Sequence, residues 1–356
     1  MTKRNYELDF LKLIFTIIVF LFHSAWLMGE NSAKFFPLLM GQVSVHFFFI
    51  VSGLLMANHI AQQEENVKFA GFSACRYVLN KVKRLVLPLW VATLLNVLLE
   101  AIYIYIYEEH SVIRIFELIT QIFPEMFLLT RSGIRIDFNS PTWYLSAMYL
   151  AMLPLAYLLF SKKDFTLYVF TPLASVLLFG YLCYANDFSF EGKYFSYLVM
   201  FEIIRAVCGL CFGVCAWTMS KKIKNSAQSK SERIFLTVTE IILYTIFFCT
   251  WFFLPNNKSI MSVQLILPIA IAITFSGRSY VVNIFRFDWM KWFAPLSLSI
   301  YLNHWAANIL VSRLFWGESY IFCLAYMILF TLLFCLVNFL VVSSIRSILR
   351  KKYPNS

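Results

Sequence analysis

Residues 8–28 read LDFLKLIFTIIVFLFHSAWLM, and the ionisable side chains of this stretch are Asp9, Lys12 and His23. A helix that crosses the hydrocarbon core of a bilayer needs about 20 predominantly apolar residues. The apolar residues follow one another without alternation, which favours a helix over a strand of a membrane barrel. The stretch is too long for a cleavable signal peptide and has no small-residue cleavage site. It therefore predicts a first membrane-spanning helix.

The whole chain repeats this pattern. Of its 356 residues, 60% are hydrophobic and 14% are charged, whereas soluble domains have about 25% charged residues. Lipid offers no hydrogen bonds to the backbone, so uninterrupted apolar segments must be helical. We therefore predict an all-α polytopic membrane protein, a single integral membrane domain over 1–356 with about ten transmembrane helices. The predicted spans are 8–28, 41–61, 85–107, 142–160, 166–184, 199–217, 235–254, 260–276, 293–316 and 320–345.

The net charge of +11 has a distribution that fits a membrane protein. With the N-terminus in the cytoplasm, 21 of the 30 lysine and arginine residues fall in inner segments, six in outer segments and three within spans. Cytoplasmic loops carry such an excess in membrane proteins. We therefore predict both termini in the cytoplasm, with 346–356 as a short basic tail. The sorting of the basic residues indicates membrane lipids, and not nucleic acid, as partners. It also indicates an inner surface suited to anionic headgroups or phosphate.

One segment outside the predicted spans has its own pattern. Residues 116–129 are interrupted by a proline and are too short to cross, which favours an interfacial or re-entrant helix. They belong to the largest outer segment, 108–141, whose mixed charges suit a polar lid over an outer pocket. The eight cysteines show no disulfide pattern, and we predict no metal site.

Lys12 and His23 are the informative polar residues of the first span. An ionisable side chain in mid-helix costs about 2.5–3.5 kcal/mol on insertion scales, so such residues commonly serve a site. Eleven residues turn a helix by about 1100°, which brings both side chains to one face, about 16 Å apart along the axis. We expect Lys12 near the cytoplasmic end and His23 near the outer end. The alternative is that Lys12 reaches the inner headgroups and His23 makes a hydrogen bond between helices.

Two other short segments have two interpretations each. Lys81 and Arg84 are three residues apart and would face the same way in a helix, with Lys83 beside them. This basic cluster is either a topology anchor or a phosphate-binding patch. In the second span, Ser52 and Gly53 either let two helix backbones approach closely or leave room for a slender ligand.

Polar residues recur in three further spans. Glu202 and Arg205, three residues apart, are expected to form an ion pair in the outer half of the sixth span. Tyr301 and His304 have the same spacing midway through the ninth span. His46 lies near the outer end of the second span, at a depth similar to that of His23.

Five sequence elements resemble the acyltransferase family 3 membrane proteins, which O-acylate cell-surface glycans. They occur in the order of the family and span nearly the whole chain. Lys12 and Lys81 stand where arginine is usual in the family. The elements are ELDFLK (7–12) with FH at 22–23, FFIVSG (48–53), KVKR (81–84) followed by Pro88, PTWYL (141–145) and SIYLNH (299–304).

The resemblance implies a membrane-bound O-acyltransferase in a bacterial cell membrane. It would move an acyl group, acetyl being the commonest in the family, from cytoplasmic acyl-coenzyme A to a hydroxyl of a cell-surface or lipid-linked glycan, with His23 as the general base. No cofactor is expected to be bound permanently, and the oligomeric state is open, a homo-oligomer included. The implied donor-binding residues are Lys12, Lys81, Lys83, Arg84, Ser52 and Gly53. The implied acceptor-binding or supporting residues are His46, Trp143, Glu202, Arg205, Tyr301 and His304.

The residues by themselves leave two other functions open. A transporter or flippase for a glycan or glycolipid would also have ionisable side chains within its helices, although the sequence shows no repeat pair and no matched broken helices. A membrane sensor domain of the same fold would need no catalytic base, so the presence of His23 favours an enzyme. Binding of acyl-coenzyme A to the purified protein would separate the enzyme from the transporter.

Overall fold

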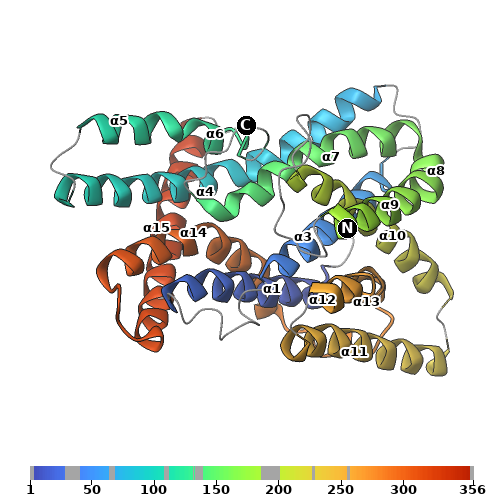
Figure 1. Ribbon diagram of the computed structural model, residues 1–356. Coiled ribbons are helices and arrows are strands. Elements are labelled where there is room, and N and C mark those ends of the chain that lie inside the picture. The colour runs from blue at the N-terminus through green and yellow to red at the C-terminus, as the bar shows by residue number, and fades with distance from the viewer. Residues whose placement is uncertain are drawn as a thin grey trace.

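The computed structural model describes residues 4–28, 41–63, 69–107, 112–130, 132, 139–185, 201–226, 229–254 and 257–352. Within these ranges the chain forms helices joined by turns, without a β-strand (Figure 1). The long helices are α1 (Tyr6–Ser24), α3 (Gln42–Ile60), α4 (Ala70–Tyr107), α7 (Trp143–Ser161), α9 (Thr171–Ala185), α10 (Phe201–Ser226), α11 (Lys230–Phe253), α14 (Phe293–Leu314) and α15 (Tyr320–Lys352). The shorter ones are α5 (Val112–Gln121), α6 (Phe123–Met126), α8 (Lys163–Phe165), α12 (Asn257–Gln264) and α13 (Leu267–Ser276).

Nine helical segments of the described residues are long and apolar enough to cross a membrane. Each corresponds to a predicted span, with α8 and α9 together forming the segment Lys163–Ala185, and α12 and α13 the segment Lys258–Ser276. Large apolar side chains such as Leu332 and Phe339 of α15 are exposed on the bundle surface, where lipid would cover them. The predicted all-α polytopic membrane fold is therefore confirmed.

The ninth predicted span, 293–316, forms the 22-residue helix α14, but α14 does not reach the hydropathy of the other nine segments. It contains Ser297, Asn303 and Asn308, all of them buried. These polar residues lower its hydropathy. Because α14 packs against α1, α4 and α15, its polar side chains find partners that lipid could not offer.

Helix α4 is longer than the predicted third span, 85–107. It runs over 38 residues, which at about 1.5 Å per residue makes it about 57 Å long, against about 30 Å for the hydrocarbon core. The basic cluster expected in a segment before the span therefore lies on the same helix. Pro88 lies within α4, and Asn338 of α15 donates a hydrogen bond from Nδ2 to its carbonyl at 2.9 Å. A second helix thus contacts α4 where proline removes a backbone donor.

Helices α5 and α6 occupy the segment that was predicted to be interfacial or re-entrant. Figure 1 shows α5 alongside α4, and the two helices are in contact. Val112 and Phe116 are exposed on one face of α5, whereas Arg114 and Glu117 line a pocket on the other. Such an amphipathic helix suits an interface. Other charged residues of the predicted lid lie outside the described residues, namely Glu108, Glu109, Arg131, Arg135 and Asp137.

The contact between α3 and α10 is built on glycine. A Cβ on Gly53 would collide with the carbonyl oxygen of Leu210, and a Cβ on Gly213 would collide with that of Ile50. The two backbones approach as closely as small residues allow in membrane helices. Of the two interpretations of Gly53, close backbone approach therefore accounts for it. The donor-binding role implied for Gly53 stays a prediction, since the helix contact alone explains why a side chain is absent at this position.

We expect Gly213→Ala to destabilise the protein. The added methyl group cannot fit between two backbones without moving a helix, and overpacking of this kind typically costs about 1–3 kcal/mol. Thermal unfolding of the protein in nanodiscs measures the effect. Gly180→Ala in α9 is the matched control, since nothing lies within 4 Å of its Cβ position. Equal melting temperatures for the two variants would contradict the close contact.

Candidate active site

The packing of α1 against α14 brings polar groups together in the middle of the bundle. The hydroxyl of Thr16 lies 2.7 Å from that of Ser297, and Asn308 donates from Nδ2 to the carbonyl of His23 at 2.9 Å. Residue numbers rise together along the seam, so the two helices run in the same direction. His23 therefore lies on the face of α1 that contacts α14, as its seven-residue spacing from Thr16 predicts.

His23 and His304 form the centre of this seam. Their rings stack with centroids 5.1 Å apart and planes 29° from parallel. Nδ1 of His304 lies 2.9 Å from the carbonyl oxygen of Tyr301 and 3.1 Å from that of Ile300, so this nitrogen carries the proton. Nε2 of His304 and Nδ1 of His23 are both buried, and neither has a hydrogen-bond partner among the described residues. Two ring nitrogens are thus available to an incoming hydroxyl.

Aromatic side chains connect the histidines to the second family element. The ring of Tyr301 lies 6.2 Å from that of His304 and 6.0 Å from that of Tyr144. The hydroxyl of Tyr144 is 3.3 Å from that of Ser52. Tyr301 itself donates a hydrogen bond to the carbonyl of Pro141. Four of the five sequence elements that resemble the family therefore meet in the core, although they lie far apart in the sequence.

His46, Trp143, Glu202 and Arg205 form a second group, on α3, α7 and α10. His46 and Arg205 are 0% and 1% exposed, and the guanidinium of Arg205 lies 5.6 Å from the centre of the Trp143 ring. Glu202 lies three residues before Arg205 on α10. The structure thus brings these four residues together, whereas Tyr301 and His304 lie beside His23. The six residues that the resemblance implies for the acceptor therefore lie in two separate groups in the structure.

The basic cluster lines a cavity of about 480 Å³ between the end of α3 and the start of α4. We call this cavity the basic pocket; its polar lining includes His59, Gln63, Arg76, Tyr77, Lys81 and Arg84. The ammonium of Lys81 lies 5.2 Å from the centre of the Tyr77 ring. Arg76, Lys81 and Arg84 have no acidic partner among the described residues. Lys83 is exposed and does not line the basic pocket.

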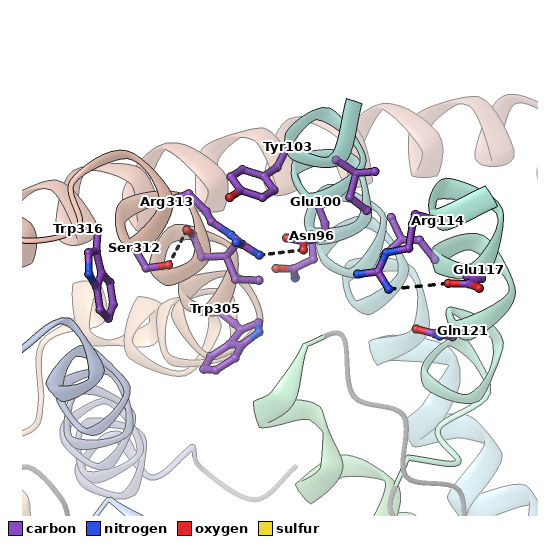
Figure 2. A pocket seen from close by; sticks show the side chains of 13 residues that line it. Asn96, Glu100, Tyr103, Arg114, Glu117, Gln121, Trp305, Ser312, Arg313 and Trp316 are labelled. Carbon is purple, nitrogen blue, oxygen red and sulfur yellow. Dashed lines mark hydrogen bonds and ion pairs between the residues drawn. The ribbon is translucent and has the colours of Figure 1, made fainter. Parts of the chain in front are cut away.

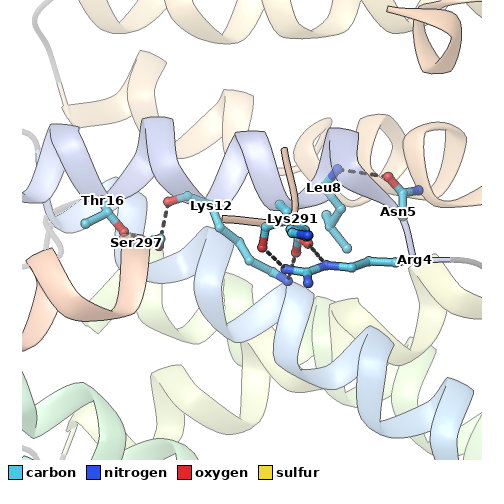
Figure 3. A network of polar contacts seen from close by, with 8 residues as sticks. Arg4, Asn5, Leu8, Lys12, Thr16, Lys291 and Ser297 are labelled. Atoms are coloured by element: carbon cyan, nitrogen blue, oxygen red, sulfur yellow. Dashed lines mark hydrogen bonds and ion pairs between the residues drawn. The ribbon is translucent and has the colours of Figure 1, made fainter. Parts of the chain in front are cut away.

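Lys12 does not line the basic pocket and is already paired. Its ammonium donates to Asp9 at 2.9 Å, and Arg4 donates to the other oxygen of Asp9 at 2.6 Å (Figure 3). Asp9 is 5% exposed, so its charge is held between two cations. Asp9 therefore offsets part of the positive charge at this end of α1, and the proximity of Lys12 to the basic cluster stays a prediction.

A second cavity, of about 650 Å³, opens between α4, α5 and α14. We call it the Trp305 pocket; its lining includes Asn96, Glu100, Arg114, Glu117, Trp305 and Arg313 (Figure 2). The ring of Trp305 also contacts that of His23, with centroids 5.2 Å apart and planes nearly perpendicular. Trp305 thus separates this pocket from the histidine pair and contacts both. The predicted lid segment contributes Arg114 and Glu117 to this pocket, whereas the contribution of Trp305 was not predicted, although Trp305 directly follows the family's last histidine.

These features define a class of protein, a polytopic membrane protein with a stacked histidine pair in its core and two polar cavities. Residues 5–346 match the family model described as an acyltransferase domain. The match covers nearly the whole chain, so the chain belongs to this family and is an acyltransferase, as its sequence elements predict. No curated protein and no solved structure matched the chain.

Proposed function

We propose that the protein transfers an acyl group, acetyl as the first candidate, from acyl-coenzyme A to a hydroxyl of a cell-surface or lipid-linked glycan in a bacterial cell membrane. The observation that supports this most is the ring of His23, whose Nδ1 is buried without a hydrogen-bond partner among the described residues and which contacts Trp305 in the wall of a polar pocket. A general base must be within hydrogen-bonding reach of the proton it takes. A hydroxyl lodged beside Trp305 would be in that position.

The donor fits the basic pocket. Coenzyme A carries phosphate groups at one end and a long, thin, mildly polar arm that ends in the thioester. Arg76, Lys81 and Arg84 would bind the phosphates with charge-assisted hydrogen bonds, which arginine can make in pairs. The arm would extend along α1 and past Ser52 toward His23. In this arrangement the basic pocket faces the cytoplasm and the Trp305 pocket faces outward, as the sorting of basic residues indicates.

The chemistry balances without a cofactor. A ring nitrogen of His23 takes the hydroxyl proton while the hydroxyl oxygen attacks the thioester carbonyl. The new carbon–oxygen bond forms the ester, the carbon–sulfur bond breaks, and the coenzyme A thiolate recovers the proton from the imidazolium of His23. General base catalysis of this kind typically contributes about 10²- to 10⁴-fold.

Mass spectrometry of surface polysaccharides from cells with and without this protein tests the proposal. We expect O-acyl groups to disappear from one glycan when the protein is absent, while the amount of that glycan is unchanged. A transporter or flippase would instead change the amount of glycan at the surface. Unaltered acylation of every surface glycan would contradict the proposed function.

A further inference from the structure

The Trp305 pocket differs from the basic pocket in its charge balance. The guanidinium of Arg313 lies 3.0 Å from a carboxylate oxygen of Glu100, and that of Arg114 lies 3.8 Å from Glu117 (Figure 2). Each cation that lines the pocket thus has an acidic partner within it. The positive charge is already matched, so the pocket offers little attraction to an anionic ligand.

Aromatic rings supply the apolar part of this pocket. The guanidinium of Arg313 lies over the ring of Tyr103 at 3.9 Å and covers that face. Trp305 and Trp316 remain, and Trp316 is 74% exposed. A flat ring with open faces can pack against the C–H groups of a sugar, and the indole N–H can still donate a hydrogen bond. Paired charges with open tryptophan rings suit a ligand that is both hydroxylated and partly apolar.

Asn96 adds an unused hydrogen-bond acceptor. It is 1% exposed and lines the pocket, and its Nδ2 donates to the carbonyl of Ala92 at 3.0 Å. Its Oδ1 is buried and has no partner among the described residues. A buried carbonyl oxygen without a partner costs free energy, so a ligand that donates a hydrogen bond there is favoured. Sugar hydroxyls are such donors.

We propose that the Trp305 pocket binds the acyl acceptor and that the bound unit is an uncharged saccharide, with Asn96 accepting a hydrogen bond from one hydroxyl and Trp305 and Trp316 packing on the ring. The proposal rests on the function proposed above, and it adds the place and the charge of the acceptor. Because Trp305 also contacts His23, a hydroxyl of the bound sugar would lie next to the base. The volume of the pocket lies within the range of about 300–1,000 Å³ that ligand sites occupy.

Binding of simple sugars to the protein in nanodiscs tests this without any acyl transfer. The probes are the methyl glycosides of glucose, galactose and N-acetylglucosamine, with methyl glucuronoside as the acidic counterpart. Saturation-transfer NMR detects weak binding of each. We expect transfer to at least one neutral glycoside, less transfer to the glucuronoside, and loss of transfer in Trp316→Ala and Asn96→Leu. Trp26→Ala is the matched control, since Trp26 is 66% exposed and does not line the pocket.

The outcomes separate this inference from the proposed function. The inference would be overturned by any of three NMR results: no saturation transfer to any neutral glycoside, stronger saturation transfer to the glucuronoside, or unchanged binding in Trp316→Ala. Trp316 is exposed, so its loss does not threaten the fold. In a transfer assay with the unacylated acceptor glycan and acyl-coenzyme A as substrates, Trp316→Ala should raise KM for the glycan about tenfold, the effect of about 1.4 kcal/mol, with KM for acyl-coenzyme A unchanged. If Trp316→Ala is active with an unchanged KM for the glycan, the assignment of the acceptor to this pocket is wrong, while the proposed function stands. If the pocket binds sugars but the protein transfers no acyl group, the proposed function is wrong, and the pocket is a sugar-binding site.

Discussion

Replacement of His23 by alanine is expected to lower acyl transfer by about 10²- to 10⁴-fold, the contribution of a general base. The reason lies in the contacts of His23: its Nδ1 is buried without a partner among the described residues, and its ring lies between His304 and Trp305. The fold should survive, because the hydrogen bond from Asn308 goes to the backbone carbonyl of His23. The measurement is the rate of acyl transfer by purified protein at saturating donor and acceptor.

Two comparisons make the His23 result specific. Ile17→Ala lies on the same helix at a half-exposed position and should retain the rate. His304→Ala removes the stacked neighbour, whose Nε2 is also unpartnered among the described residues, and should lower the rate less than His23→Ala. If His304→Ala abolished transfer while His23→Ala remained active, the base would be His304.

Removal of both Lys81 and Arg84 is expected to raise KM for acyl-coenzyme A by about a hundredfold or more. Hydrogen bonds to charged groups contribute about 1.5–3 kcal/mol each. Both side chains line the basic pocket without an acidic partner among the described residues. The rate at saturating donor should change far less, since these residues lie away from the reacting atoms. Initial rates over a range of donor concentrations measure the effect.

A matched double variant controls for the loss of two basic residues. Lys222→Ala with Lys230→Ala removes two exposed lysines that lie outside the basic pocket, and it should leave KM for the donor unchanged. Adenosine 3′,5′-bisphosphate, which carries the phosphate end of the donor, should inhibit the unsubstituted enzyme and lose potency in Lys81→Ala with Arg84→Ala. Lys83→Ala should have a smaller effect than either pocket residue. An unchanged donor KM in the double variant would show that Lys81 and Arg84 are topology anchors.

The sequence predicts the fold well because lipid restricts the choices. Apolar segments of sufficient length must be helices, so nine spans could be located from hydropathy alone. Helix α14 shows where this signal weakens: Asn303 is 1% exposed and accepts a hydrogen bond from Asn338 at 3.2 Å. Polar side chains that pair with each other inside the bundle lower the hydropathy of their helix, although the polar groups themselves do not face lipid. The length of α4 was missed for a related reason, since a helix that extends beyond the bilayer carries charge.

The candidate site was predicted in part. Helical spacing placed Lys12 and His23 on one face, and the structure adds what that face contacts, namely Asp9 at one end and His304 at the other. The sequence predicted a polar lid over an outer pocket but not which helices form the Trp305 pocket. This pocket depends on the packing of α5 beside α4 and α14, and no local pattern specifies which helices become neighbours. Asn96 is informative only once its burial is known.

Transfer across a sealed membrane tests the proposed passage of the acyl group most directly. Proteoliposomes would carry labelled acetyl-coenzyme A on one side and the neutral glycan acceptor on the other, with His23→Ala as the background. We expect label to reach the acceptor across the membrane, because the basic pocket and the Trp305 pocket lie toward opposite ends of α4 and His23 lies beside the second. Labelling only when donor and acceptor share a side, or equal labelling with His23→Ala, would contradict this mechanism.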